Sequence, residues 1–172
     1  MTAQPTVPTR ASASMLGPNW LEVGLAIGFA LIFAGMVYGM ARGLESSMEA
    51  PAIVWLHLAV LLIVAGLTPV MMLRRRGDRS HRVLGWIWCT GMFASAIISL
   101  GIRHIGHGRL SGIHVLSFIY LLLIPLLILA ARSHRRRTHR VVVAIALSIL
   151  LLAGAATFVP PRFLGSWMFG VS

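Results

Sequence analysis

Residues 112–140 read GIHVLSFIYLLLIPLLILAARSHRRRTHR, a long apolar run that ends in a cluster of arginines. The apolar part has about 20 residues, which is the length that an α-helix needs to cross the ~30 Å hydrocarbon core of a bilayer. Because lipid offers no hydrogen-bond partner to an exposed backbone, such a run must be helical. This stretch therefore predicts a membrane-spanning helix followed by a basic loop at one membrane surface.

The same pattern recurs along the chain. Apolar segments of similar length lie at roughly residues 20–41, 52–73, 83–102, 110–131 and 140–159. Only 11% of the 172 residues are charged, against about a quarter in a soluble domain, and 58% are hydrophobic. This composition excludes a soluble globular domain and a disordered chain. It predicts an all-α, polytopic membrane protein with five transmembrane helices.

Three regions follow from these segments. Residues 1–19 are polar and lack the features of a secretory signal, so we expect a flexible cytoplasmic tail. Residues 20–159 form the predicted five-helix transmembrane domain. The fifth helix cannot continue past Pro160 and its proline neighbour. Residues 160–172 are therefore predicted to form an interfacial tail on the outer face, anchored by the aromatic side chains of Phe163, Trp167 and Phe169.

All fifteen basic residues are arginine, and their distribution predicts the orientation. Eleven lie in the N-terminal tail and in the second and fourth connections: Arg10, Arg74, Arg75, Arg76, Arg79, Arg82, Arg132, Arg135, Arg136, Arg137 and Arg140. Four lie on the opposite side: Arg42, Arg103, Arg109 and Arg162. The positive-inside rule then places the N-terminus in the cytoplasm and the C-terminus outside a bacterial inner membrane.

The net charge of +11 is explained by these arginines at the membrane surface. We expect anionic lipid headgroups to be their partners. The arginines occupy helix ends and do not line one face, which argues against nucleic-acid binding.

An internal repeat spans residues 52–159. His81 follows His57 by 24 residues, and His139 follows His114 by 25, with a proline near the middle of each interval. This spacing predicts two equivalent hairpins that form a four-helix bundle, with a site at their interface. Coincidence among leucine-rich helices is the alternative interpretation.

The four histidines of this repeat are the candidate site residues, because ionisable side chains inside a bilayer are rare. His57 and His114 lie about five residues inside the outer ends of their helices, so we expect them to share one depth. His81 and His139 stand at the cytoplasmic starts of their helices. Two facing imidazoles can each give one nitrogen to an iron and donate a hydrogen bond from the other. The pattern therefore predicts two haem b groups, held by His57 with His114 and by His81 with His139.

The alternative is that each of the four histidines bonds a neighbouring helix, or that the cytoplasmic pair anchors lipid headgroups. His104 and His107 form an H-x-x-H pattern in a glycine-rich loop, which is a weaker candidate for copper or zinc because no cysteine or carboxylate accompanies it. We interpret His134 as solvated and Cys89 as a buried thiol.

The first helix carries a stripe of glycines on one face: Gly24, Gly28, Gly35 and Gly39. Glycines spaced in this way permit close contact between membrane helices. They are predicted to pack against the rest of the chain or against a partner membrane protein.

Two resemblances add to this interpretation. HRVLGW at 81–86, the stretch at 112–140 and AGAATFVPPRFLGSWMFG at 153–170 resemble a family of predicted bacterial membrane proteins known as a domain of unknown function. The resemblance covers roughly residues 50–170 and implies an integral membrane protein with no assigned activity. The histidine pattern is also similar to that of the di-haem transmembrane cytochromes b of the ascorbate-reducible type. In that family the first histidine pairs with the third and the second with the fourth, which implies the pairs given above.

Two functions are consistent with the sequence. The first is a di-haem electron carrier across the cytoplasmic membrane. The second is a cofactor-free accessory or structural subunit of a membrane complex, which binds lipid and partner helices. Transport of a small solute has only the repeat in its favour. No nucleophile–base pair, phosphate loop or carboxylate pair supports hydrolase or nucleotide-dependent chemistry.

The predicted orientation can be checked by labelling. Single cysteines placed beside Arg76 or Arg136 in a Cys89→Ser background should resist a membrane-impermeant thiol reagent in intact cells and react after permeabilisation. Ready labelling in intact cells would reverse the topology and the leaflet of every histidine.

Overall fold

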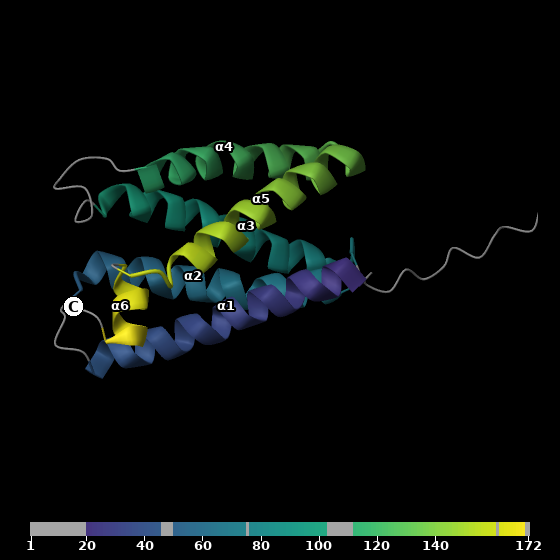
Figure 1. Cartoon of the computed structure of the whole chain (residues 1–172). Coiled ribbons are helices and arrows are strands. Elements are labelled where there is room, and N and C mark those ends of the chain that lie inside the picture. The colour runs from purple at the N-terminus through teal and green to yellow at the C-terminus, as the bar shows by residue number, and fades with distance from the viewer. Residues whose placement is uncertain (1–19, 46–49, 75, 103–111, 161, 171–172) are drawn as a thin grey trace, which may run out of the picture.

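The structure is a computed structural model that describes residues 20–45, 50–74, 76–102, 112–160 and 162–170. These residues form six helices, and five of them are long and apolar enough to cross a membrane. The membrane-length helices are α1 (Trp20–Glu45), α2 (Ala52–Leu73), α3 (Arg79–Gly101), α4 (Gly112–Arg132) and α5 (Arg136–Ala156). The short α6 (Phe163–Phe169) follows α5 (Figure 1). The all-α class and the five membrane-length helices are confirmed.

Two helices begin earlier than their apolar segments. The third helix, predicted from residue 83, begins at Arg79 because the side chain of Asp78 caps it and accepts a hydrogen bond from the backbone N–H of His81 at 2.6 Å. The fifth, predicted from residue 140, begins at Arg136. Polar first turns are common because the terminal N–H groups of a helix are satisfied outside the bilayer core. His81 and His139 therefore lie inside the first turns of α3 and α5.

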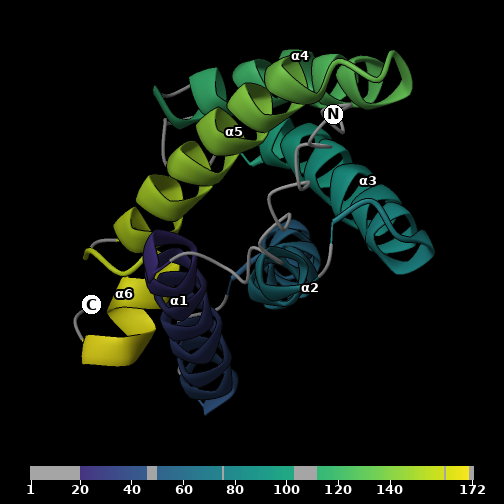
Figure 2. The same ribbon diagram turned by 90° about the vertical axis from the view of Figure 1, so that its right-hand side faces the viewer.

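Helices that follow one another in sequence pack side by side, from α1 to α5, and α1 also contacts α5 (Figure 2). The described helices α2 and α5 make no close backbone contact, so α1 completes the bundle between them. The repeated pair of hairpins, α2–α3 and α4–α5, is thus part of a five-helix arrangement. We call the end with the α2–α3 and α4–α5 connections the arginine-rich end.

The glycine stripe of α1 packs within the chain. A methyl group added to Gly28 would lie 3.5 Å from Leu151 of α5, and one added to Gly39 would lie 2.6 Å from Leu164 of α6. Gly35 faces Phe158 in the same way, whereas Gly24 has nothing within 4 Å. The backbone of α1 can approach α5 and α6 because no side chain intervenes. Binding of a partner protein to α1 stays a prediction.

Helix α6 is a packed element of the fold. Its Trp167 is 3% exposed and stacks on Trp55 of α2, with ring centroids 4.9 Å apart. Gly43, one turn beyond the predicted stripe, lies under the same indole: a methyl group there would be 2.5 Å from Trp167. The α6 segment therefore joins α1 to α2 at the end opposite the arginines. Residues 1–19, predicted to be a flexible tail, lie outside the described residues.

This contact predicts the effect of a single methyl group. Gly43→Ala should destabilise the protein by about 1–3 kcal/mol, because the added carbon overpacks the α1–α6 contact. Gly24→Ala is the matched control and should be neutral or stabilising by up to about 1 kcal/mol, since alanine is the better helix former. Unfolding of the purified protein in detergent, followed by tryptophan fluorescence, measures both. Equal effects of the two substitutions would contradict this packing.

Candidate functional site

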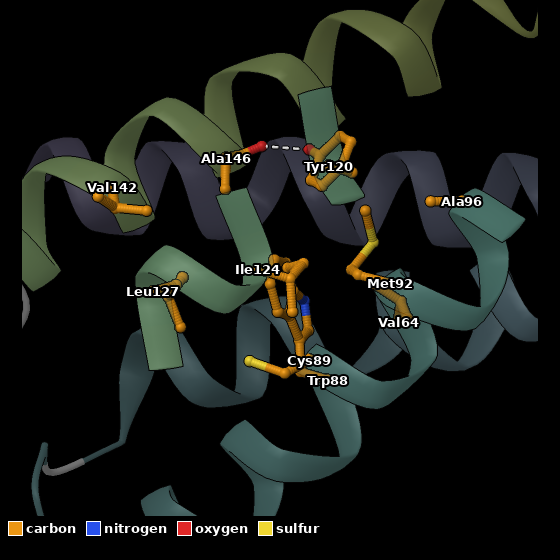
Figure 3. Close-up of a cluster of buried hydrophobic side chains, with 10 residues drawn as sticks. All are labelled: Val64, Trp88, Cys89, Met92, Ala96, Tyr120, Ile124, Leu127, Val142 and Ala146. Carbon is orange, nitrogen blue, oxygen red and sulfur yellow. Dashed lines mark hydrogen bonds between the residues drawn. The ribbon is translucent and has the colours of Figure 1, made fainter. Parts of the chain in front are cut away.

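Polar side chains inside the bundle bond to a neighbouring helix. Trp88 of α3 donates to Thr68 of α2 at 3.0 Å, and Ser117 of α4 donates to Ser99 of α3 at 3.0 Å. Tyr120 of α4 donates to the carbonyl of Ala146 in α5, beside the largest apolar cluster (Figure 3). Each bond satisfies a polar group that lipid would leave without a partner.

His57 and His114 belong to this set of helix-to-helix contacts. The Nδ1 atom of His57 on α2 lies 3.3 Å from Oγ of Ser95 on α3. His114 on α4 is 2% exposed, and its Nε2 atom lies 3.1 Å from the carbonyl oxygen of Ile102, just beyond α3. Both rings therefore contact α3, from the helices on its two sides.

The two contacts are made at different heights on α3. Ser95 and Ile102 are seven residues apart, which corresponds to about 10 Å along a helix axis. His57 is the sixth residue of α2, whereas His114 is only the third residue of α4. The spacing in the sequence predicted a common depth, and the different positions of the helix starts explain why the rings meet α3 at separate levels.

His81 and His139 have a different environment at the arginine-rich end. The Nδ1 atoms of both rings are buried and have no hydrogen-bond partner among the described residues. The two rings lie within range of each other's charge. They come from α3 and α5, whose described residues make no close backbone contact with each other. Two unsatisfied imidazoles therefore belong to the same region between separated helices.

Helix register explains why both rings point into the bundle. At about 100° per residue, His81 projects within roughly 20° of Trp88 and Met92, which are buried on α3. His139 projects within roughly 20° of Ala146, which is fully buried on α5. The inward faces of both helices thus end in a histidine at the arginine-rich end.

A buried polar atom without a partner costs about 1–3 kcal/mol. Both Nδ1 atoms bear this cost, so a ligand that bonds both rings would remove both costs. Among the described residues, no three His, Cys, Asp or Glu side chains form a group that could hold a metal ion. Any metal between His81 and His139 would therefore need most of its ligands from a non-protein molecule.

The carboxylates near this end already have partners. Asp78 caps α3, and Glu22 of α1 pairs with Arg76 in the connection between α2 and α3. The side chains of Arg79, Arg82, Arg136 and Arg140 are exposed. The region around the two histidines consequently carries excess positive charge, which suits an anionic ligand.

The sequence interpretation missed the partners of His57 and His114, which are Ser95 and the carbonyl of Ile102. Ser95 was visible only as a hydroxyl inside an apolar helix, 14 residues and thus close to four turns after His81. His134 is exposed and has a positive φ of 52°, in agreement with its interpretation as solvated. Cys89 is buried, as expected. His104 and His107 lie outside the described residues.

No family model matches this chain, and comparisons with curated proteins and with solved structures also found no match. Function must therefore be inferred from the side chains themselves.

The two histidine pairs should respond differently to substitution in protein prepared without haem. His57→Leu should destabilise by about 0.5–1.5 kcal/mol, because it removes the contact with Ser95. His81→Leu should be neutral or stabilising, because it removes a buried nitrogen that has no partner. Denaturant unfolding in detergent measures both values. A loss at His81 as large as that at His57 would mean that the His81 ring has a partner in the protein.

Proposed function

We propose that this integral membrane protein is a b-type haem protein that carries electrons across the cytoplasmic membrane. The observation that supports this most is the pair of buried, unpartnered imidazole nitrogens of His81 and His139 at the arginine-rich end. We assign these two residues as the axial ligands of one haem.

Haem fits this pair better than a bare metal ion does. A zinc or copper site in a protein uses three or four side chains, and only two are present here among the described residues. A haem iron takes four ligands from its porphyrin and needs only the two axial ones from the chain. The two histidines lie on α3 and α5, whose described residues make no close backbone contact with each other, as expected of helices that would hold a cofactor from two sides.

The surroundings of the pair also suit haem. The propionates are anionic, and exposed arginines such as Arg136 and Arg140 stand within one turn of His139. Toward the middle of the bundle, the faces of α3 and α5 that carry the histidines continue into the buried side chains of Met92 and Val142. Apolar residues exclude water from a bound cofactor and tune its potential.

We extend the proposal to a second haem between His57 and His114. The contact of His57 Nδ1 with Ser95 supports this, because a ligating histidine commonly donates its second ring N–H to a hydroxyl or carbonyl oxygen. His57 and His114 contact α3 from its two sides and about two turns apart, so both rings would have to shift, and His114 would have to release the carbonyl of Ile102, before they could hold one haem. The second haem is therefore expected to bind more weakly than the first.

Bound haem would supply one-electron chemistry, and the protein would supply its position. The chain would hold the two rings in fixed orientation from α3 and α5 and shield them from water. Two haems at opposite ends of the bundle would shorten the distance that an electron must cross between the membrane surfaces.

The test is the absorption spectrum of the protein purified in detergent from haem-replete cells. We expect a Soret band, reducible α-bands and a pyridine haemochrome content near two per chain. His81→Ala or His139→Ala should each remove about one haem, and the double variant should remove no more, since both ligate the same iron. His57→Ala or His114→Ala should remove the other, and His134→Ala, at an exposed histidine, should remove none.

A colourless protein that cannot be loaded with haem would contradict this proposal. Equal haem content in all the variants would show that the assigned histidines are not the ligands. The accessory-subunit function would then be favoured, with α5 as the contact surface for a partner. Only 11% of the residues in the most apolar window of α5 are buried, against 28–33% in the other membrane-length helices.

A further inference from the structure

We propose that Arg82, Trp86 and Arg132 form a binding site for the phosphate of an anionic phospholipid, on the outside of the bundle between α3 and α4. The proposal uses none of the four histidines and does not depend on haem binding.

The contact between Arg132 and Trp86 is the core of the site. Arg132 is the last residue of α4, and its guanidinium carbon lies 5.8 Å from the centroid of the Trp86 indole on α3. A guanidinium over an aromatic ring is held by a cation–π interaction. This contact uses the charge of the guanidinium and leaves its N–H donors available for the oxygens of a phosphate.

Arg82 supplies a second exposed guanidinium on the same face of α3. It lies one helical turn before Trp86 on α3, and therefore on the same side of that helix. Its Nη1 atom donates to the carbonyl of Gly77 at 3.1 Å, which ties the side chain to the end of the helix. Both arginines are exposed.

Neither arginine has a carboxylate partner among the residues that the structure describes. The ion pairs found there join Arg42 with Glu45 and Arg76 with Glu22, and Asp78 caps α3. Two guanidinium groups on the same surface repel each other, and an anion bound by both would turn this repulsion into attraction. The positive charges of Arg82 and Arg132 therefore favour binding of an anionic group.

The neighbouring surface identifies that anion as a lipid headgroup. Large apolar side chains are exposed next to the arginines on the same two helices: Val83 is 52% exposed, Ile87 46% and Leu129 60%. Trp86 itself is 51% exposed, and tryptophan is typical of the boundary between headgroups and acyl chains. A phospholipid would use both the charges and this apolar surface, whereas a soluble phosphate would use only the charges. Basic pockets between membrane helices bind anionic headgroups in this way.

The experiment is native mass spectrometry of the protein in neutral detergent with equal amounts of phosphatidylglycerol and phosphatidylcholine. We expect the wild type to retain phosphatidylglycerol with a preference of roughly tenfold or more, since each arginine near a lipid surface contributes to the attraction. The double variant Arg82→Gln with Arg132→Gln should lose most of this preference. Trp86→Leu, which keeps every charge, should weaken it because Arg132 is no longer held.

Arg135→Gln with Arg137→Gln is the matched control, because it removes two exposed charges at the same end that make no cation–π contact with Trp86. This control should keep the preference for phosphatidylglycerol. The proposal is overturned if the wild type shows no preference, or if both double variants lose it equally, which would indicate a diffuse charge effect. Displacement of the lipid by inorganic phosphate at the same concentration would also overturn it. If the Arg82 and Arg132 double variant does not elute as a single species, Trp86→Leu is compared with the control instead. An equal preference for phosphatidylglycerol in these two proteins would then overturn the proposal.

Discussion

Lipid offers no hydrogen bond to a polar side chain, and this constraint organises the bundle. Buried indole and phenol groups inside α2–α5 find partners on a neighbouring helix, as Trp88 does on Thr68 and Tyr120 on the carbonyl of Ala146. Such bonds are worth little individually, about 0.6 kcal/mol on average between membrane helices. Their larger effect is on specificity, because a leucine-rich helix can rotate against its neighbour without much cost, whereas a rotated polar group loses its partner.

Helix α1 packs against α5 and α6 through complementary shape. Glycines bring the backbone of α1 close to α5 and α6, and Gly43 accommodates the face of Trp167. The stacking of Trp167 on Trp55 then ties the C-terminal segment to α2. The C-terminal segment, which the sequence predicts to be a surface anchor, therefore packs against other helices. Helix α1 completes the ring of helices.

The two histidine pairs differ because their positions on the helices differ. His57 meets a hydroxyl of α3 and His114 meets the carbonyl of Ile102 just beyond that helix, so both rings contribute to helix packing. His81 and His139 meet no such group, although their rings face the same region from α3 and α5. Among the described residues the indole nitrogen of Trp167 is also buried without a partner, but it lies at the other end of the bundle, whereas the Nδ1 atoms of His81 and His139 both lie at the arginine-rich end. For this reason the proposed haem site rests mainly on the second pair.

The five membrane-length helices, the basic connections and the candidate histidines were all determined by local sequence. Apolar runs of about 20 residues and the clustering of arginine depend only on the thickness and surface charge of a bilayer. The partners of those residues were decided by tertiary structure. Nothing local distinguishes Ser95 from any other serine in an apolar helix, and the level at which His114 meets α3 depends on where α4 begins. The docking of Trp167 under α1 likewise required the fold, because a contact between residues more than 100 positions apart has no local signal. Sequence periodicity specifies the face on which a side chain lies, whereas helix order, tilt and depth determine what that face meets.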